Sequence, residues 1–313
     1  MDLFNDKSME AAFRYARAQT AHYSKSFYLS SAMLPKERRW ATYALYGFCR
    51  YADNIIDNPR NRSAQELIDE IDYMSNELVI AYHRWESEHP ILKPFIWVAQ
   101  KHGIPIEYPL DLLKGVKMDI QKNRYENFDE LYLFCYRVAG VVGLMMTHVL
   151  GYKSKDAFFY AEKLGIAMQL TNILRDVQED KNMNRIYLPM DELEAHGLVT
   201  KDVMNERMNG KMKKFMRFQI KRALQYYSEA NQGIRLLNTE TQFAIYAASR
   251  IYEGILKKIE ARNYDPFKGR VYVKQGKKFL ILLFEIIKTK INQFGELIFP
   301  SAYMAGMDDK GKA

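Results

Sequence analysis

Hydrophobic and polar positions along the chain recur mostly with helical spacing. In FFYAEKLGIAMQLTNILRDV, residues 158–177, apolar residues return every three or four positions over several turns, as in a helix with one buried face. Strand-like alternation is rare, and RVYV at residues 270–273 is its best example. The pattern therefore predicts an all-α helical bundle whose functional groups lie in the core between helices.

Proline and glycine divide this pattern into segments of ordinary helix length. These breakers are Pro35, Pro59, Pro90, Gly103, Pro105, Pro109, Gly151, Pro189, Gly197 and Pro266. No low-complexity block or flexible linker interrupts residues 8–298. We therefore expect a single domain over residues 1–298, followed by a disordered tail at residues 299–313.

The overall composition indicates which kinds of partner and which cellular compartment to expect. Hydrophobic residues make up 48% of the chain, which permits a sizeable core, and the formal charge of +8 suits an anionic partner. Charge alone does not separate nucleic acid, an acidic membrane and a phosphorylated small molecule. Cys49 and Cys135 both lie in apolar runs, without the spacing of a zinc site or a disulfide framework. A reducing cytoplasm is therefore expected.

Membrane-spanning segments are not expected from the sequence. The N-terminus has early acidic residues and no apolar core of a signal peptide, and no run approaches the ~20 apolar residues that a transmembrane helix needs. The longest apolar run is FLILLFEII at residues 279–287, with lysines on both sides. Such a run fits a core helix, which we favour, or a helix resting on a membrane surface.

Two aspartates share one helical face in YGFCRYADNIIDNPR, residues 46–60. Asp53 and Asp57 are four residues apart, a spacing at which like charges cost roughly 0.2–0.5 kcal/mol. Their position before a helix end adds ~0.3–1 kcal/mol of unfavourable dipole interaction. They could be solvated surface acids, but Arg50 and Tyr46 continue the same stripe and the flanks are apolar. Such a pair is also a suitable platform for Mg²⁺.

A second polar stripe occurs between apolar flanks further along the chain. Its members, at steps of three, four and four, are Gln169, Asn172, Asp176 and Asp180. Two independent solvated faces are the alternative, but two such stripes on apolar helices would be costly to bury without cations. We therefore expect the stripes to face each other and to hold Mg²⁺, with Arg50, Arg175 and Arg185 pairing with phosphate groups.

These residues suggest a class of reaction. Mg²⁺ between facing acids, without a nucleophilic His or Cys nearby, suggests a diphosphate leaving group whose charge the metal neutralises. The rest of the substrate would need an apolar cavity, which the abundant Phe, Tyr and Met residues could line. Their rings could also stabilise a carbocation.

Four sequence blocks resemble those of the squalene/phytoene synthase family. They are SKSFYLSSAMLP, YALYGFCRYADNIID, MDIQKNRYENFDELYLFCYRVAGVVGLM and QLTNILRDVQEDKNMNRIYLP. The blocks occur in family order from about Ala21 to about Lys277. Within the family, the chain looks most like bacterial phytoene synthases.

The resemblance implies a single all-α isoprenoid-synthase domain with a central apolar cavity. It implies Mg²⁺-dependent head-to-head coupling of two prenyl diphosphates through a cyclopropylcarbinyl diphosphate, with two geranylgeranyl diphosphates giving phytoene in carotenoid biosynthesis. The alternative within the family is farnesyl diphosphate as substrate, giving dehydrosqualene, or squalene if NADPH reduces the last cation. An alternative of another class is a non-catalytic scaffold on a membrane surface, which the intact acidic motifs disfavour.

The resemblance also assigns roles to individual residues. It implies Mg²⁺ ligands at Asp53, Asp57, Asn172, Asp176 and Asp180. It implies substrate or diphosphate contacts at Ser24, Lys25, Ser26, Tyr46, Arg50, Gln169, Arg175 and Arg270, and tyrosines near the reacting carbons at Tyr136 and Tyr252. The chain departs from the family in having Tyr23 where some members have His, and Asn54 where many double the first acid.

The expected partners follow from this chemistry. They are prenyl diphosphates and a peripheral membrane surface, without nucleic acid. Long-chain substrates partition into membranes, so a cytoplasmic protein that associates peripherally with a membrane is expected. The sequence does not indicate the oligomeric state.

Overall fold

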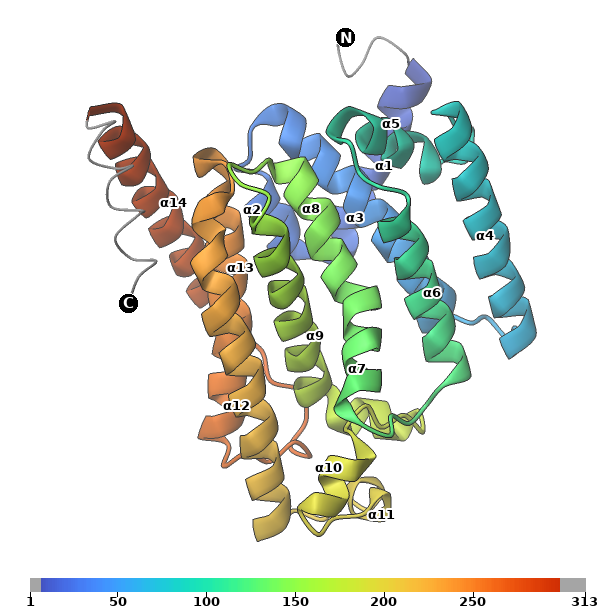
Figure 1. The fold of residues 1–313 in the computed structure, drawn as a ribbon, viewed down its shortest axis with the longest axis vertical. Helices are drawn as coiled ribbons and strands as arrows, with labels where there is room; N and C mark the ends of the chain where they lie inside the picture. The colour runs from blue at the N-terminus through green and yellow to red at the C-terminus, as the bar shows by residue number, and fades with distance from the viewer. Residues whose placement is uncertain (1–6, 299–313) are drawn as a thin grey trace.

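The longest helix, α9 (Ala157–Asn182), runs through the middle of the molecule (Figure 1). The computed structural model describes residues 7–298, and it describes side chains for residues 7–292 except Ser26. Helix α9 packs against α8, α12 and α13 and against a short π-helix, η1. The bounds of the other helices are α1 (Lys7–Tyr23), α2 (Lys25–Ser31), α3 (Lys36–Asp57), α4 (Ala64–Arg84), α5 (Leu92–His102), α6 (Glu107–Gln121), α7 (Phe128–Cys135), η1 (Tyr136–Gly140), α8 (Val141–Leu150), α10 (Met190–Ala195), α11 (Thr200–Met204), α12 (Gly210–Gly233), the 3₁₀-helix η2 (Ile234–Leu236), α13 (Thr239–Ala261) and α14 (Gln275–Ile298).

The prediction of an all-α bundle is confirmed. Between residues 7 and 298 the regular elements are all helices, and only two isolated β-bridges occur. The strand-like interpretation of residues 270–273 is wrong, because this segment is an extended connection between α13 and α14. Its alternation has another cause: Val271 and Val273 are buried against the bundle, while Tyr272 between them is exposed.

Local sequence signals explain several helix ends. Ser63 accepts a hydrogen bond from the backbone amide of Glu66, whose carboxylate in turn accepts one from the Ser63 amide, a capping box that starts α4. The side chains of Asn127 and Asn209 cap the starts of α7 and α12 by accepting hydrogen bonds from the backbone amides of Glu130 and Met212. Gly103 ends α5 in the left-handed conformation that glycine adopts without strain. Pro109, expected as a breaker, lies in the first turn of α6, where its missing N–H costs nothing.

Gly165 allows α9 to approach the π-helix closely. A Cβ atom at this position would lie 2.3 Å from the carbonyl oxygen of Ala139 and 2.8 Å from the Cα of Gly140. Gly165→Ala should therefore lower the free energy of unfolding by roughly 1–3 kcal/mol, since backbone overlap outweighs the helix propensity that alanine adds. Urea unfolding measures the effect. Gly210→Ala, with open space around its Cβ, is the control, and equal stability of the two variants would contradict the packing argument.

We expect the free energy of unfolding to fall in acid because two histidines are partly buried. His148 contacts the backbone carbonyl of His102 through Nδ1 at 3.1 Å, and burial lowers the pKa of both rings below the ordinary value. The unfolded chain therefore binds protons at a higher pH than the folded one. Stability should be fully present above about pH 7 and fall toward about pH 5.

The contribution of His148 can be isolated by substitution. Unfolding free energies of His148→Gln should depend less on pH over this range than those of wild type. The exposed His83→Gln serves as the control, and a wild-type pH slope in His148→Gln would rule out this origin.

One helical segment reaches membrane-spanning length, contrary to the sequence expectation. The stretch Phe128–Leu150, formed by α7, η1 and α8 together, is long and apolar enough to cross a bilayer by length and composition, and half of its most apolar window is buried. It packs against α6 and α9 inside the bundle. A core helix of a bundle has the same profile, so this feature is weak evidence for a membrane span.

Candidate active site

A cavity of about 920 Å³ opens between the helices of the bundle. Helix α9 lines it along most of its length, from Ala157 and Ala161 through Met168 to Asn172 and Asp176. This stretch of helix spans roughly 28 Å at 1.5 Å per residue. The start of α9 contributes small and apolar side chains, and its end contributes polar ones. The cavity is therefore elongated, with an apolar end and a polar end.

The first acidic stripe enters the polar end from α3. Tyr46, Arg50, Asp53 and Asp57 all line the cavity. Arg50 donates to the Asp57 carboxylate at 3.0 Å and to the Asn54 amide oxygen at 2.6 Å. Its buried Nε makes no hydrogen bond within the part of the chain that the structure describes. An anionic ligand in the cavity could satisfy this donor.

Aromatic rings from α1 and α2 pack against Arg50 and Tyr46 of the first acidic stripe. The Arg50 guanidinium lies over the ring of Tyr23, 4.4 Å from its centroid, a cation–π contact. Tyr46 stacks on Phe27, with the two ring centroids 5.1 Å apart. Tyr23, the residue at which the chain departs from some family members, therefore supports an arginine of the acidic stripe.

Asp53 forms no ion pair with another described residue. Its side chain is exposed at the cavity, although the protein atoms packed around it reduce its hydration. Burial first, and then the charge of Asp57, raise the pKa of Asp53 to about 7. Arg50 opposes this shift but does not cancel it. A bound cation would favour the ionised form of this carboxylate.

The second acidic stripe reaches the same cavity from α9. Gln169, Asn172 and Asp176 line it, and the Asn172 amide donates to Gln169 at 3.3 Å. Arg175 pairs with Asp176 through Nε at 2.7 Å and Nη2 at 2.5 Å, so its planar head is fixed at the cavity wall. Arg270 reaches the same carboxylate from the connection before α14, with Nε at 3.2 Å. Both stripes thus face one cavity, and the arginines lie beside the acids.

Asp180 and Arg185 lie at the edge of this arrangement. They line a small void next to the cavity rather than the cavity itself. Burial and the charges of Asp176 and Asp119 raise the pKa of Asp180 to about 7. Arg185 is within 3.3 Å of the Asp119 carboxylate. Asp180 is therefore close enough to interact with the charges of Asp176 and Asp119, and Arg185 pairs with Asp119 outside the cavity lining.

Asp119 is a cavity residue that the sequence analysis missed. It lies near the end of α6, lines the cavity, and accepts a hydrogen bond from the Tyr187 hydroxyl at 2.5 Å. Burial raises its pKa, and its charge contributes to the raised pKa of both Asp53 and Asp180. Asp119 therefore lies between the two stripes. The available signal was its place at the start of the third family-like block, MDIQKNRYENF.

The aromatic residues near the acids differ from those expected. Within CYRVAG, residues 135–140, Val138 and Ala139 line the cavity and Tyr136 does not, whereas Phe134 just before this segment does. Phe134 stacks on Tyr187, with centroids 5.3 Å apart, and Tyr187 also lines the cavity. Tyr252, from α13, lines it as expected. Phe134 and Tyr136 are two residues apart, so they point to nearly opposite sides of the helix, and the cavity lies on the side of Phe134.

The remaining expected contacts lie at the start of α2. Ser24 lines the cavity as the residue before the helix, and Lys25 is exposed and does not line it. The side chain of Ser26 lies outside the described residues. Lys278 of α14, which the sequence analysis treated only as a flank of an apolar run, lines the cavity. Burial, and then the nearby charge of Arg175, lower the Lys278 pKa, so two cations converge at the polar end.

The donor set fits Mg²⁺, although it forms no closed cage. Among the described residues, no three His, Cys, Asp or Glu side chains are close enough to enclose a metal ion. Mg²⁺ does not require such a cage, because it commonly uses one or two carboxylates and completes its octahedron with water and substrate phosphates. Desolvation and neighbouring acids raise the pKa of Asp53 and of Asp180, and both side chains have the hard oxygen atoms that this ion prefers.

Comparisons with known proteins agree with this geometry. A family model described as Squalene/phytoene synthase matches residues 20–277. The chain is 35% identical over 295 residues to a phytoene synthase of Arthrospira platensis, covering 90% of this chain and 94% of that one. It is 37% identical over 293 residues to Phytoene synthase 3, chloroplastic, of Zea mays, covering 88% of this chain and 66% of that one. A crystal structure of a dehydrosqualene synthase in complex with ligand is similar at a TM-score of 0.83 and 29% identity, covering 92% of this chain and 99% of that one.

Proposed function

Because this chain belongs to the squalene/phytoene synthase family, as its sequence blocks predicted, we propose that it couples two geranylgeranyl diphosphates head to head to give phytoene. The first coupling releases one diphosphate and one proton and forms a cyclopropylcarbinyl diphosphate. The second ionisation releases the other diphosphate, and rearrangement ends with loss of a second proton. The observation that carries the proposal is one elongated cavity with acids and arginines at one end and apolar side chains at the other.

The polar end suits the binding of diphosphate groups. Arg50 has an unused buried donor, and Arg175 and Lys278 present positive charge at the cavity wall. Arginine forms charge-assisted, often bidentate hydrogen bonds with phosphate oxygens. In the proposed reaction these side chains fix the leaving group and stabilise its charge as the C–O bond breaks.

Metal ligation is proposed for the four aspartates and the asparagine that the resemblance named. Asp53, Asp57, Asn172, Asp176 and Asp180 would hold Mg²⁺, and Asp119 between them adds to the negative field. When bound, Mg²⁺ supplies neutralisation of the diphosphate charge.

The apolar end suits a long hydrocarbon chain and a cationic intermediate. Its lining includes Leu150, Ile234 and Leu237, whose aliphatic side chains do not react with a carbocation. Exclusion of water protects such an intermediate from hydrolysis. Nearer the acids, the rings of Phe134 and Tyr252 present faces that can stabilise positive charge.

A second candidate is the same coupling with farnesyl diphosphate. The likeness to a dehydrosqualene synthase over most of both chains supports it. Its product would be dehydrosqualene, or squalene if NADPH reduces the final cation. We propose that the catalytic domain spans residues 1–298 and that the protein acts in the cytoplasm in contact with membranes.

Incubating the purified protein with Mg²⁺ and each prenyl diphosphate, with and without NADPH, tests the choice between these reactions. We expect phytoene from geranylgeranyl diphosphate, independent of NADPH. Hydrocarbon from farnesyl diphosphate alone would favour the second candidate. Absence of hydrocarbon and of released diphosphate from both substrates would refute the proposed activity.

Ligand binding without turnover gives a separate prediction. Mg²⁺ together with inorganic diphosphate should raise the melting temperature of wild type, since a ligand at a hundredfold excess over its Kd stabilises by about 2.7 kcal/mol. The increase should be smaller for Asp57→Ala, which lacks a proposed ligand and the partner of Arg50. Thermal unfolding with Asp69→Ala as the exposed control measures this. An equal increase in all three proteins would place the binding elsewhere.

A further inference from the structure

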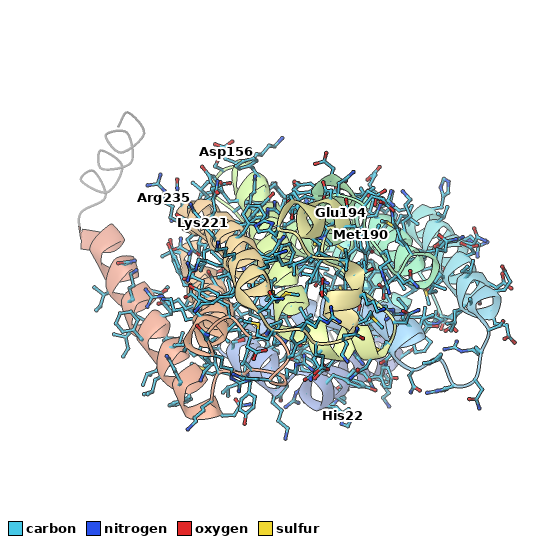
Figure 2. All side chains as sticks on the ribbon, turned by 90° about the horizontal axis from the view of Figure 1, so that it is seen from below. His22, Asp156, Met190, Glu194, Lys221 and Arg235 are labelled. Atoms are coloured by element: carbon cyan, nitrogen blue, oxygen red, sulfur yellow. The ribbon has the colours of Figure 1, made fainter. Side chains whose placement is uncertain are left out.

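Helix α14 exposes a broad apolar face to solvent. Six large hydrophobic side chains on it are between 43% and 65% exposed. At 100° per residue they span an arc of about 140° on one side of the helix. They are Phe279, Leu280, Leu283, Phe284, Ile287 and Ile291, and we call them the α14 outer face. The helix lies at one edge of the bundle in both views (Figures 1 and 2).

The opposite side of α14 accounts for its attachment to the bundle. Leu282, Glu285 and Thr289 are buried, and the helix packs on α13 and touches α2. The covered side packs through Leu282, Ile281 and Ile286, whereas nothing in the described chain covers the outer face. A contiguous exposed apolar face of this kind marks a surface that binds protein or lipid. The preference for a plain core helix at residues 279–287 was therefore wrong for its outer half.

The charges around the outer face are of one sign. Lys277, Lys288 and Lys290 are exposed along the same helix. Among the side chains described on α14, Glu285 is the single acid, and it is buried beside Arg250, with 2.8 Å between Arg250 Nε and the carboxylate. Lys277 and Lys288 lie beside the apolar arc, and Lys290 lies within it near the end of the described side chains. An apolar face with lysines in these positions complements a bilayer with anionic lipids, which offers apolar chains beneath negative headgroups. A second copy of this chain would bring the same lysines together.

The outer face is continuous with the mouth of the cavity. Phe279 lines the cavity and is also half exposed, as is Leu29 of α2. Tyr272, in the connection before α14, lines the cavity and is 70% exposed. Aromatic side chains at such a boundary are typical of membrane interfaces. A molecule moving between a bilayer on this face and the cavity would therefore pass along apolar side chains.

We propose that the α14 outer face, together with Leu29, docks on the surface of an anionic lipid bilayer, so that the cavity opens toward the membrane. Long-chain substrate enters and hydrocarbon product leaves along this face. The entry and exit rest on the proposed function, whereas the docking itself does not.

Co-sedimentation with vesicles tests the docking. Wild type should bind phosphatidylcholine vesicles that contain phosphatidylglycerol. Leu283→Gln/Ile287→Gln should bind about tenfold or more weakly, since it removes two apolar side chains from the interface. The control is Val79→Gln/Ile80→Gln on α4, at the opposite edge of Figure 1, where the side chains are 40% and 45% exposed. It should bind like wild type.

Substitution of the lysines gives a second, independent test of the docking. Lys277→Gln/Lys290→Gln should weaken binding to the anionic vesicles by about fivefold for each lysine. Its binding to vesicles of phosphatidylcholine alone should be close to that of wild type. Weaker binding of wild type in high salt should match the loss in this variant.

Other occupants of the face would give different results. If a second copy covers it, light scattering will show a wild-type dimer that Leu283→Gln/Ile287→Gln dissociates, with vesicle binding unchanged. If another segment of the chain covers it, a tryptophan in Leu283→Trp will not be quenched by brominated lipids. Either outcome, or no vesicle binding by wild type, overturns the proposal.

Activity assays separate this proposal from the proposed function. In detergent micelles that supply substrate without a bilayer, Leu283→Gln/Ile287→Gln should turn over substrate like wild type, whereas with vesicle-bound substrate it should be slower. Vesicle binding that depends on the outer face, in a protein without turnover, would refute the proposed reaction and leave the docking intact.

Discussion

Asp176→Asn is expected to lower the rate of diphosphate release from geranylgeranyl diphosphate by roughly 10²–10³-fold, the loss typical of a removed group that stabilises transition-state charge. The Asp176 carboxylate fixes Arg175 in a two-point pair and also holds Arg270. The amide of asparagine keeps the size but cannot neutralise either guanidinium or ligate Mg²⁺ with full charge. Steady-state release of diphosphate at saturating substrate measures the effect.

The control for this substitution is Asp69→Asn, on the exposed face of α4, where the carboxylate accepts a hydrogen bond from Gln65. It should retain wild-type turnover. The melting temperature of Asp176→Asn without ligands should fall, because Arg175 and Arg270 lose their carboxylate partner, so turnover is measured at a temperature at which thermal unfolding shows the variant to be folded. A turnover within a few-fold of wild type would remove Asp176 from the proposed machinery.

Asp119→Asn is expected to lower turnover by about a hundredfold and to raise the Mg²⁺ concentration needed for half-maximal rate. Asp119 lies between the two acidic stripes and adds to the negative potential at both. The substitution also removes the negative partner of Arg185 and weakens the bond from Tyr187. Turnover measured across a Mg²⁺ titration separates the two effects.

Helix α6 offers a matched control for Asp119. Asp111, eight residues earlier on the same helix, pairs with Lys114 and does not line the cavity. Asp111→Asn should behave like wild type in turnover and in Mg²⁺ requirement. If Asp119→Asn loses activity without any change in its Mg²⁺ requirement, the role of Asp119 is to position Tyr187 and Arg185 rather than to attract the metal.

Much of the candidate site could be predicted because it follows from local periodicity. Residues at steps of three and four share a helical face whatever the helix packs against. The stripes through Asp53 and through Asp176 were therefore defined within single segments, and both face the cavity. The fold class was predictable for the same reason, since apolar residues repeat with helical period and breakers mark most helix ends.

Other members of the site depend on packing between distant segments. Asp119, Arg270 and Lys278 come from three separate elements, and no spacing in the sequence relates them to either stripe. Phe134 and Tyr136 are two residues apart, so they point to nearly opposite sides of their helix. Which of the two faces the cavity depends on the helices that pack around this segment, and the spacing within it does not decide this.

The sequence by itself determined that the protein is an α-helical bundle, that two acidic stripes occur on apolar helices, and to which family the chain belongs. These properties are encoded in short segments, where residue spacing fixes the direction of each side chain relative to its own helix. Only the tertiary structure decided that the stripes share one cavity with Asp119 between them, and that α14 leaves an apolar face uncovered. Those properties depend on the angles at which the helices pack, and these angles are set by contacts between side chains of many separate segments.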